Sequence, residues 1–92
     1  MTRESLAAAL ETEGLSKTNK GYQVPPKREA VCLVGAPGEV VTIERLSRID
    51  LQDKYILLEN QKRERFFFAY EDVLGLRLTA EGPGERMAGF GR

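Results

Sequence analysis

KRERFFFAY, residues 62–70, decides how the fold of this 92-residue chain is read, because it sets charged side chains directly against three consecutive phenylalanines. In a strand, successive side chains point to opposite faces, so Phe66 and Phe68 would share one face while Arg65 and Phe67 share the other. Burial of one phenylalanine ring stabilises a fold by about 1.5 to 3 kcal/mol, so the face with two rings belongs to the core. The sequence therefore predicts that Phe67 points outward among arginines.

The outward ring can have three roles. It can lie beneath an N-terminal helix or a linker, because small barrels need extra elements to cover both faces of a sheet. It can form a protein interface, since an exposed aromatic ring between arginines matches the composition of binding hot spots. It can also stack on a base, although three glutamates within residues 59–71 dilute the positive charge that phosphates require. We predict a contact patch for a partner made of Arg63, Arg65 and Phe67, with Arg45 and Arg48 as an extension if the second expected strand, residues 40–50, lies alongside.

Short apolar runs alternate with turn residues throughout residues 30–79. This pattern predicts a mainly β fold, with five strands in a bent antiparallel sheet or small SH3-like barrel. In VVTIERLSRID, residues 40–50, the apolar alternation slips by one residue at Leu46. A bulge or sharp bend near residues 44–46 would produce that slip and would curl the sheet. In the last strand, the alternation predicts a half-buried strand with Leu74, Leu76 and Leu78 on one face.

The residues before the strands predict one helix followed by a linker. Thr2 can cap a helix over residues 3–13, Leu6 and Leu10 fall on one face, and Gly14 can end it in the left-handed conformation. The following segment has no apolar periodicity and contains a proline pair, so it either packs along the domain through Tyr22 and Val24 or serves as a recognition segment. The expected division is a helix at 1–15, a linker at 16–29, a small β-barrel domain at 30–79 and a flexible tail at 80–92.

The charge balance limits the partners of the chain. Lysine and arginine number 14, as do aspartate and glutamate, so the whole molecule has no net field to attract nucleic acid or an anionic membrane. Electrostatic binding must come from a local patch. No window approaches the ~18 apolar residues of a membrane-spanning helix, so we expect no membrane insertion. The N-terminus lacks a long apolar core like that of a signal peptide, and we expect a cytoplasmic protein.

The residue inventory argues against an enzyme or a metal protein. General acid and base catalysis near neutral pH most often uses histidine, and the chain has none. Its single cysteine, Cys32, lies in an apolar run and is expected to be buried, and it can form no disulfide within the chain. One cysteine without histidine rules out zinc-type ligation. We therefore predict no catalytic residues, no metal and no cofactor.

Two families of small β domains show similar patterns over residues 30–79. A glycine turn at Gly38, alternating apolar residues at Val41 and Ile43, and later an aromatic strand with an acidic pair before Val73 resemble PRC-barrel adaptor domains. That resemblance implies a small barrel that binds other proteins.

The stretch IDLQDKYILLE, residues 49–59, is similar to Sm-like domains through Ile49, Asp50, Ile56 and Leu57. That resemblance implies a small barrel that binds single-stranded RNA. Lys54 stands where an RNA-contacting asparagine is expected, and no Arg-Gly pair follows.

Taken together, these features predict a non-catalytic protein-interaction module, either an adaptor or a subunit of an assembly, which binds a protein partner through its basic and aromatic strand face. An unprotected edge strand in so small a sheet can also pair with a second copy of the chain, which predicts a homo-oligomer. The alternative is a small barrel that binds single-stranded RNA or DNA.

Overall fold

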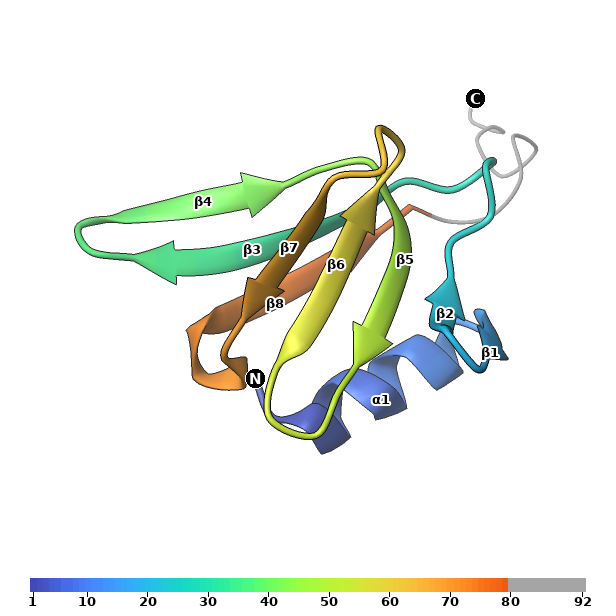
Figure 1. The fold of residues 1–92 in the computed structure, drawn as a ribbon, viewed down its shortest axis with the longest axis horizontal. Helices are drawn as coiled ribbons and strands as arrows, with labels where there is room; N and C mark the ends of the chain where they lie inside the picture. The colour runs from blue at the N-terminus through green and yellow to red at the C-terminus, as the bar shows by residue number, and fades with distance from the viewer. Residues whose placement is uncertain (80–92) are drawn as a thin grey trace, which may run out of the picture.

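The computed structural model describes residues 1–79, so the tail predicted at 80–92 lies outside the described residues. The protein is mainly β, as predicted, with one α-helix and two antiparallel sheets (Figure 1). Within the described residues, the two sheets do not close into a barrel. The elements are α1 (Arg3–Thr12), β1 (Ser16–Thr18), β2 (Gly21–Gln23), β3 (Ala30–Ala36), β4 (Glu39–Ile43), β5 (Leu46–Leu51), β6 (Ile56–Asn60), β7 (Arg65–Phe68), the 3-10 helix η1 (Tyr70–Asp72) and β8 (Val73–Leu78).

The predicted bend near residues 44–46 divides the chain between the two sheets. One sheet has the strand order β1-β2-β5-β6-β7 and the other has the order β4-β3-β8. The stretch read as one strand over residues 40–50 is therefore two strands, which end and begin on either side of Arg45, whose φ is 56°. Ile43 before the bend and Leu46 after it are both buried. The bend is needed because a straight strand could not direct both side chains into one core.

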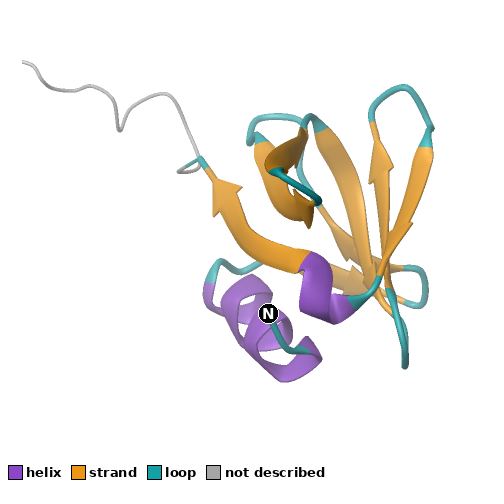
Figure 2. Ribbon diagram, turned by 90° about the vertical axis from the view of Figure 1, so that its left-hand side faces the viewer, coloured by secondary structure: helices purple, strands orange, loops and turns teal. Residues whose placement is uncertain are grey.

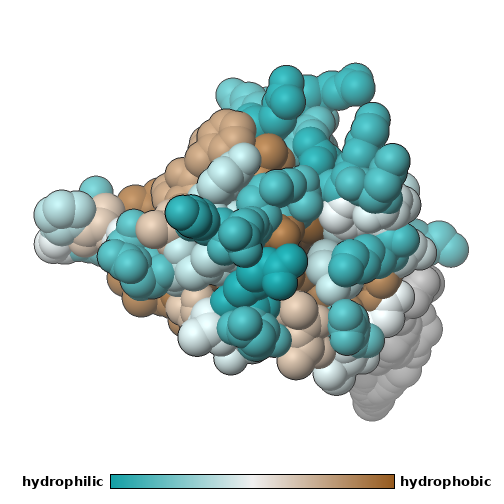
Figure 3. All heavy atoms as spheres, turned by 60° about the horizontal axis from the view of Figure 1, so that its bottom comes forward, coloured by the Kyte–Doolittle hydropathy of each residue, from teal (hydrophilic) through white to brown (hydrophobic). Residues whose placement is uncertain are grey.

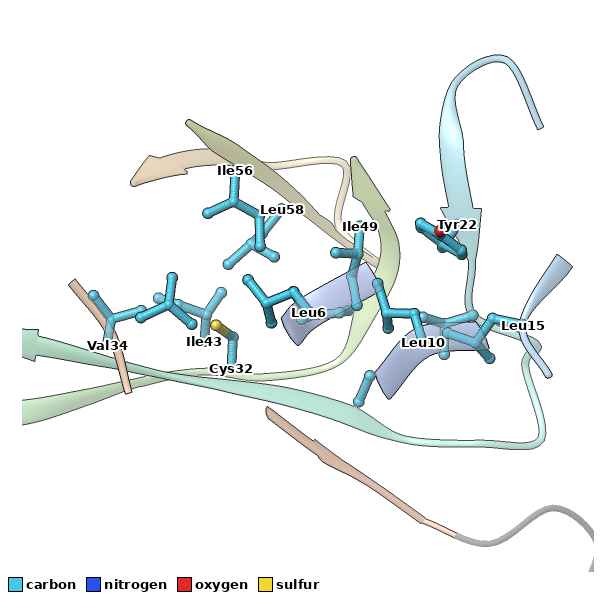
Figure 4. Close-up of a cluster of buried hydrophobic side chains, with 14 residues drawn as sticks. Leu6, Leu10, Leu15, Tyr22, Cys32, Val34, Ile43, Ile49, Ile56 and Leu58 are labelled. Carbon is cyan, nitrogen blue, oxygen red and sulfur yellow. The ribbon is translucent and has the colours of Figure 1, made fainter. Parts of the chain in front are cut away.

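Helix α1 packs its two leucines into the core between the sheets (Figure 4). The Thr2 side chain caps the helix by accepting from the amide of Ser5 at 3.0 Å. Leu6 and Leu10 are fully buried. The apolar face of the helix consists mainly of these two leucines, so the helix depends on their packing against the core for its stability. Figure 2 shows the helix lying beside β8. Among residues 1–79, no helix is long and apolar enough to cross a membrane.

The segment predicted as a linker, residues 16–29, contains a short hairpin. Strand β2 pairs with β5 through Tyr22 and Ile49, so the hairpin extends the five-stranded sheet. Tyr22 and Val24 are both buried, in agreement with the alternative in which this segment packs along the domain. Two strands of three residues, one of them wholly exposed, are too short to show an apolar period.

Arg28 holds the end of this segment in place. It is the buried charged residue of the described chain, with 5% of its surface exposed. Its guanidinium donates to the main-chain carbonyl of Glu13 at 3.0 Å, to the Glu13 carboxylate, and to the carbonyl of Thr79 at 2.8 Å. One side chain thus joins the end of α1 to the end of β8.

The last strand differs from the prediction at one leucine. Leu76 and Leu78 pack against the core as expected, but Leu74 is 55% exposed, and Val73 takes its place in the interior. The pairing register between β3 and β8 shifts between Leu33 and Val34. An extra residue in one strand reverses the alternation of its side chains, so the regular pattern of leucines in the sequence was misleading at this position.

Candidate functional site

The outer face of the five-stranded sheet presents two aromatic rings. Phe67 on β7 pairs with Leu57 on β6, and its ring lies against that of Tyr55, with centroids 5.7 Å apart and planes tilted by 55°. Phe67 is 58% exposed and Tyr55 is 40% exposed. Phe66 and Phe68 pack against the core from the other face. The predicted alternation of the three phenylalanines is therefore confirmed.

The interpretation that α1 covers Phe67 is wrong. Leu6 and Leu10, the residues expected to make that cover, are buried in the core between the two sheets. The reason is that Leu6 and Leu10 have a larger apolar surface to bury against there, where six strands contribute fully or nearly buried side chains. Within the described part of the chain, the Phe67 ring therefore remains accessible to a partner.

A row of charged residues crosses the same face beside the rings. The strand pairings place Arg48 opposite Glu59 and Glu59 opposite Arg65, so the carboxylate stands between two arginines. Glu59 Oε1 accepts from Arg48 Nη2 at 2.6 Å and from Nε at 3.1 Å. Arg48 Nη1 donates to the carbonyl of Lys20 at 2.8 Å and lies 3.7 Å from Asp50 Oδ2. The Arg48 guanidinium is therefore held by several acceptors.

The surroundings of Glu59 stabilise its charged form. The hydrogen bond from Arg48 lowers the pKa of the Glu59 carboxyl against the opposing effect of burial, and the charges of Arg48, Arg65 and Arg63 lower it further. Glu59 Oε2 lies 3.9 Å from Arg63 Nε. One carboxylate therefore faces three guanidinium groups and cannot neutralise them all.

Glu59 and the positively charged side chains around it line a surface hollow of about 500 Å³, which we name the cationic hollow. Its positive side chains outnumber its one carboxylate by four to one, and Asp50 beside Arg48 adds a second negative charge nearby. Such a hollow can accept carboxylates, because guanidinium groups bind them through paired hydrogen bonds. The lining residues are Lys20, Gln23, Arg48, Glu59, Arg63 and Arg65.

The structure brings together four of the five residues predicted for the contact patch. Arg65 and Phe67 share the outer face of β7, and Arg48 lies in the neighbouring row of charges. Arg63 lies in the turn before β7, with φ of 69° and a side chain that is 84% exposed. Arg45 does not line the cationic hollow. It lines a separate polar pocket with Glu44 and the turn between β6 and β7, and its carbonyl accepts from the amide of Gln61 at 2.9 Å.

Two residues of the face were missed by the sequence analysis. Lys20 reaches the cationic hollow only because the hairpin of β1 and β2 folds onto β5, and no local pattern signals that contact. Tyr55 could have been found, because it lies two residues before Leu57 and therefore has the parity of the outer face of β6.

The potential metal ligands and the thiol of the described residues can be placed individually. Among residues 1–79, no three side chains of histidine, cysteine, aspartate or glutamate gather to hold a metal ion. Cys32 is fully buried, and burial raises the pKa of its thiol to about 11, so it remains protonated near neutral pH.

Comparison of the chain with protein-family models, with curated proteins and with solved structures finds no match.

Proposed function

We propose that this chain is a non-catalytic protein-interaction module that binds a partner through the outer face of its five-stranded sheet. The observation that carries the proposal is the position of an exposed ring pair directly beside the cationic hollow. We name this surface the basic-aromatic face and define it by Tyr55, Phe67, Arg48, Arg63 and Arg65.

The two halves of the face favour one class of partner. An apolar side chain of the partner can pack over the exposed rings of Phe67 and Tyr55. The rings become buried in the complex and then serve as the anchor that protein interfaces require. Acidic side chains next to that anchor can then meet Arg63 and Arg65, which the fold leaves exposed. Arg48 is already bound by Glu59, so it positions the carboxylate and contributes less to the partner. An acidic segment with an apolar anchor is the partner that these residues fit.

A second candidate function rests on the same rings. Aromatic side chains beside cations also stack on the bases of single-stranded RNA or DNA. However, Glu59 and Asp50 offset two of the four positive charges around the hollow, and the chain has no net charge to steer a polyanion toward it. These charges favour the protein partner.

The test captures binding partners from the native cell on the immobilised chain and on matched variants. We expect a specific protein to be retained by the unchanged chain, lost with Phe67→Ala, and reduced with the double variant Arg63→Ala plus Arg65→Ala. Leu74→Ala and Arg77→Ala are the controls, because these residues are exposed on another sheet, and they should retain the protein. Circular dichroism checks that each variant is folded.

Two results would count against the proposal. If Phe67→Ala and Leu74→Ala retain the same proteins in the same amounts, the basic-aromatic face is not the binding surface. If the chain instead binds single-stranded RNA with an affinity that falls steeply with salt and with the double arginine variant, the nucleic-acid function is the correct one.

A further inference from the structure

The cationic hollow holds more positive charge than the carboxylates around it can balance. Its four basic side chains face two carboxylates, Glu59 in the hollow and Asp50 beside it, so two positive charges are left over. A third carboxylate, that of Glu64, follows Arg63 in the sequence, but it accepts from the side chain of Asn60 at 2.7 Å and lines a different pocket. The excess charge is therefore a property of the folded site.

Three of the four cations of the hollow are accessible to a ligand. Arg48 is held, because its Nε and Nη2 donate to Glu59 and its Nη1 donates to the main-chain carbonyl of Lys20. Lys20, Arg63 and Arg65 are exposed. Arg63 Nε lies 3.9 Å from Glu59 Oε2, which is beyond hydrogen-bond distance. An anion in the hollow can therefore meet these three side chains directly.

The backbone that carries the three accessible cations is fixed by hydrogen bonds and strand pairing. The amide of Lys20 donates to Thr18 Oγ1 at 3.1 Å in the turn between β1 and β2. In the turn before β7, Asn60 Oδ1 accepts from two amides at 2.9 Å, and the Asn60 carbonyl accepts from the amide of Arg63 at 3.0 Å. Arg65 is the first residue of β7. The cations thus approach the hollow from two sides, the hairpin turn and the start of β7.

We propose that the cationic hollow binds the phosphoryl group of a phosphorylated side chain on the protein partner. This inference rests on the proposed function and names the group that the partner presents. A phosphorylated side chain carries about 1.5 to 2 negative charges near pH 7 and has three strong acceptor oxygens, whereas a carboxylate carries one charge on two oxygens. The phosphoryl group therefore matches both the two excess charges and the three accessible cations.

The exposed rings lie beside the hollow at a distance that an extended partner segment can match. Arg65 and Phe67 are two residues apart on one face of β7, which separates their Cα atoms by about 7 Å. An extended segment repeats its side chains on one face with the same period, so an apolar residue two positions from the phosphorylated one can reach the rings. Apolar surface also gathers next to the projecting hairpin of β3 and β4 (Figure 3), but β4 contains no basic residue.

The backbone of a nucleic acid fits the hollow less well. Each internal phosphate of RNA or DNA is a diester with one negative charge, so it leaves one of the two excess positive charges unbalanced. Since the chain has no net charge, a polyanion also gains no attraction from the rest of the molecule. The charge of the hollow favours a single phosphate monoester.

The first test compares two small probes. Methyl phosphate is a monoester with two negative charges when fully ionised, and dimethyl phosphate is a diester with one. Each is titrated at constant ionic strength into the isotope-labelled chain and followed by NMR. Methyl phosphate should shift the backbone amide signal of Lys20 and the Nε–H signals of Arg63 and Arg65 in a saturable manner. It should bind at least about fivefold more tightly than dimethyl phosphate, the gain of one further exposed ion pair.

A pair of lysine variants separates the hollow from the overall charge of the chain. Lys20→Gln removes a cation that lines the hollow and that is not part of the basic-aromatic face, and it should weaken methyl phosphate binding about fivefold. Lys54→Gln is the matched control, because this exposed lysine of the turn between β5 and β6 does not line the hollow. Since salt screens distant charges, the control should change the affinity by less than about twofold. The same NMR spectra show that each variant is folded.

The second test places the phosphoryl group beside the rings. A fluorescent peptide carries phosphoserine two residues before phenylalanine, and its counterparts carry glutamate or serine at the same position. Fluorescence anisotropy should show the tightest binding for the phosphoserine peptide and the weakest for the serine peptide, with steps of about fivefold. Phe67→Ala should weaken all three peptides, because it removes the anchor. Lys20→Gln should weaken the phosphoserine peptide most.

Several results would overturn the phosphoryl site. The absence of a saturable shift with methyl phosphate, or equal effects of Lys20→Gln and Lys54→Gln, would show that the hollow is not a binding site for this group. Equal or tighter binding of dimethyl phosphate would favour a nucleic acid instead. If the phosphoserine and glutamate peptides bind equally and both depend on Phe67, the proposed function stands and this inference fails.

Discussion

Arg28 and Glu13, fifteen residues apart in the sequence, are joined twice, by hydrogen bonds from the arginine to the main-chain carbonyl and to the carboxylate of Glu13. This connection ties the end of α1 to the chain just before β3, and the third bond from Arg28 to Thr79 reaches the end of β8. The helix is thereby held on the core at its C-terminal end by a residue within the segment that the sequence predicted as a linker.

Replacement of this arginine should strongly destabilise the protein. Arg28→Met leaves two main-chain carbonyls without their donor and one carboxylate without its partner, which we expect to cost about 3 kcal/mol of unfolding free energy. Urea unfolding followed by circular dichroism measures this cost. The control is Arg77→Met on the exposed side of β8, which should change stability by less than about 0.5 kcal/mol. Equal stability of the two variants would contradict the role assigned to Arg28.

Gly21 should tolerate a side chain much less well than Gly38. Both glycines have positive φ, at 110° and 78°, so both pay the strain of that conformation when replaced by alanine. At Gly21 the added carbon would also lie 2.7 Å from the carbonyl oxygen of Ile49, whereas at Gly38 no atom lies within 4 Å. We therefore expect Gly21→Ala to lower the melting temperature clearly more than Gly38→Ala, because it pushes β2 away from β5.

The thiol of Cys32 should report unfolding. Burial raises its pKa to about 11, so at pH 8 the folded chain carries almost no thiolate, and the side chain is also closed to reagents. A thiol-reactive dye should label the folded chain slowly and the urea-unfolded chain at once. Thr42→Cys, whose new thiol is exposed on β4, should label rapidly without urea. Fast labelling of the unchanged folded chain would show that β3 opens readily.

Glu59 should make the stability of the sheet depend on pH. Because the pKa of Glu59 is lower in the folded chain than in the unfolded chain, its contribution is present above the ordinary carboxyl pKa and is lost as pH falls through the folded value. Glu59→Gln should therefore reduce stability at pH 7, on the order of 1 kcal/mol. The difference from the unchanged chain should shrink toward zero as the pH falls through the lowered pKa of Glu59. A difference that stays constant over this range would show that the charge of Glu59 has no role.

Substitutions on the two faces of β7 should have different effects on stability. Phe67→Ala removes a ring that is 58% exposed and should cost less than about 1 kcal/mol, mainly through its contact with Tyr55. Phe66→Ala removes a ring packed against the core and should cost about 3 kcal/mol. Thermal unfolding of both variants measures the contrast. A large loss for Phe67→Ala would mean that the ring is part of the core and does not form a docking surface.

Local patterns predicted several features of the fold correctly. The helix cap at Thr2, the helix stop at Gly14 and the alternation of Phe66, Phe67 and Phe68 all depend on contacts within a few residues of each other. The bend near Arg45 could be predicted in the same way, because the alternation of apolar side chains slips by one residue within residues 40–50. Other features had no local signal. The bulge that exposes Leu74 arises from its pairing with β3, and the separate pocket of Arg45 arises from its contact with the turn between β6 and β7.

The sequence by itself determined which side of β7 faces the core, because the alternation of side chains along a regular extended backbone is a property of the backbone alone. Only the tertiary structure decided which charges meet. Lys20, Glu59 and Arg63 come from different parts of the chain, and the pairing of β2, β5, β6 and β7 brings them into one hollow. Electrostatic interactions depend on distance in space, and that distance exists only after the sheets have formed.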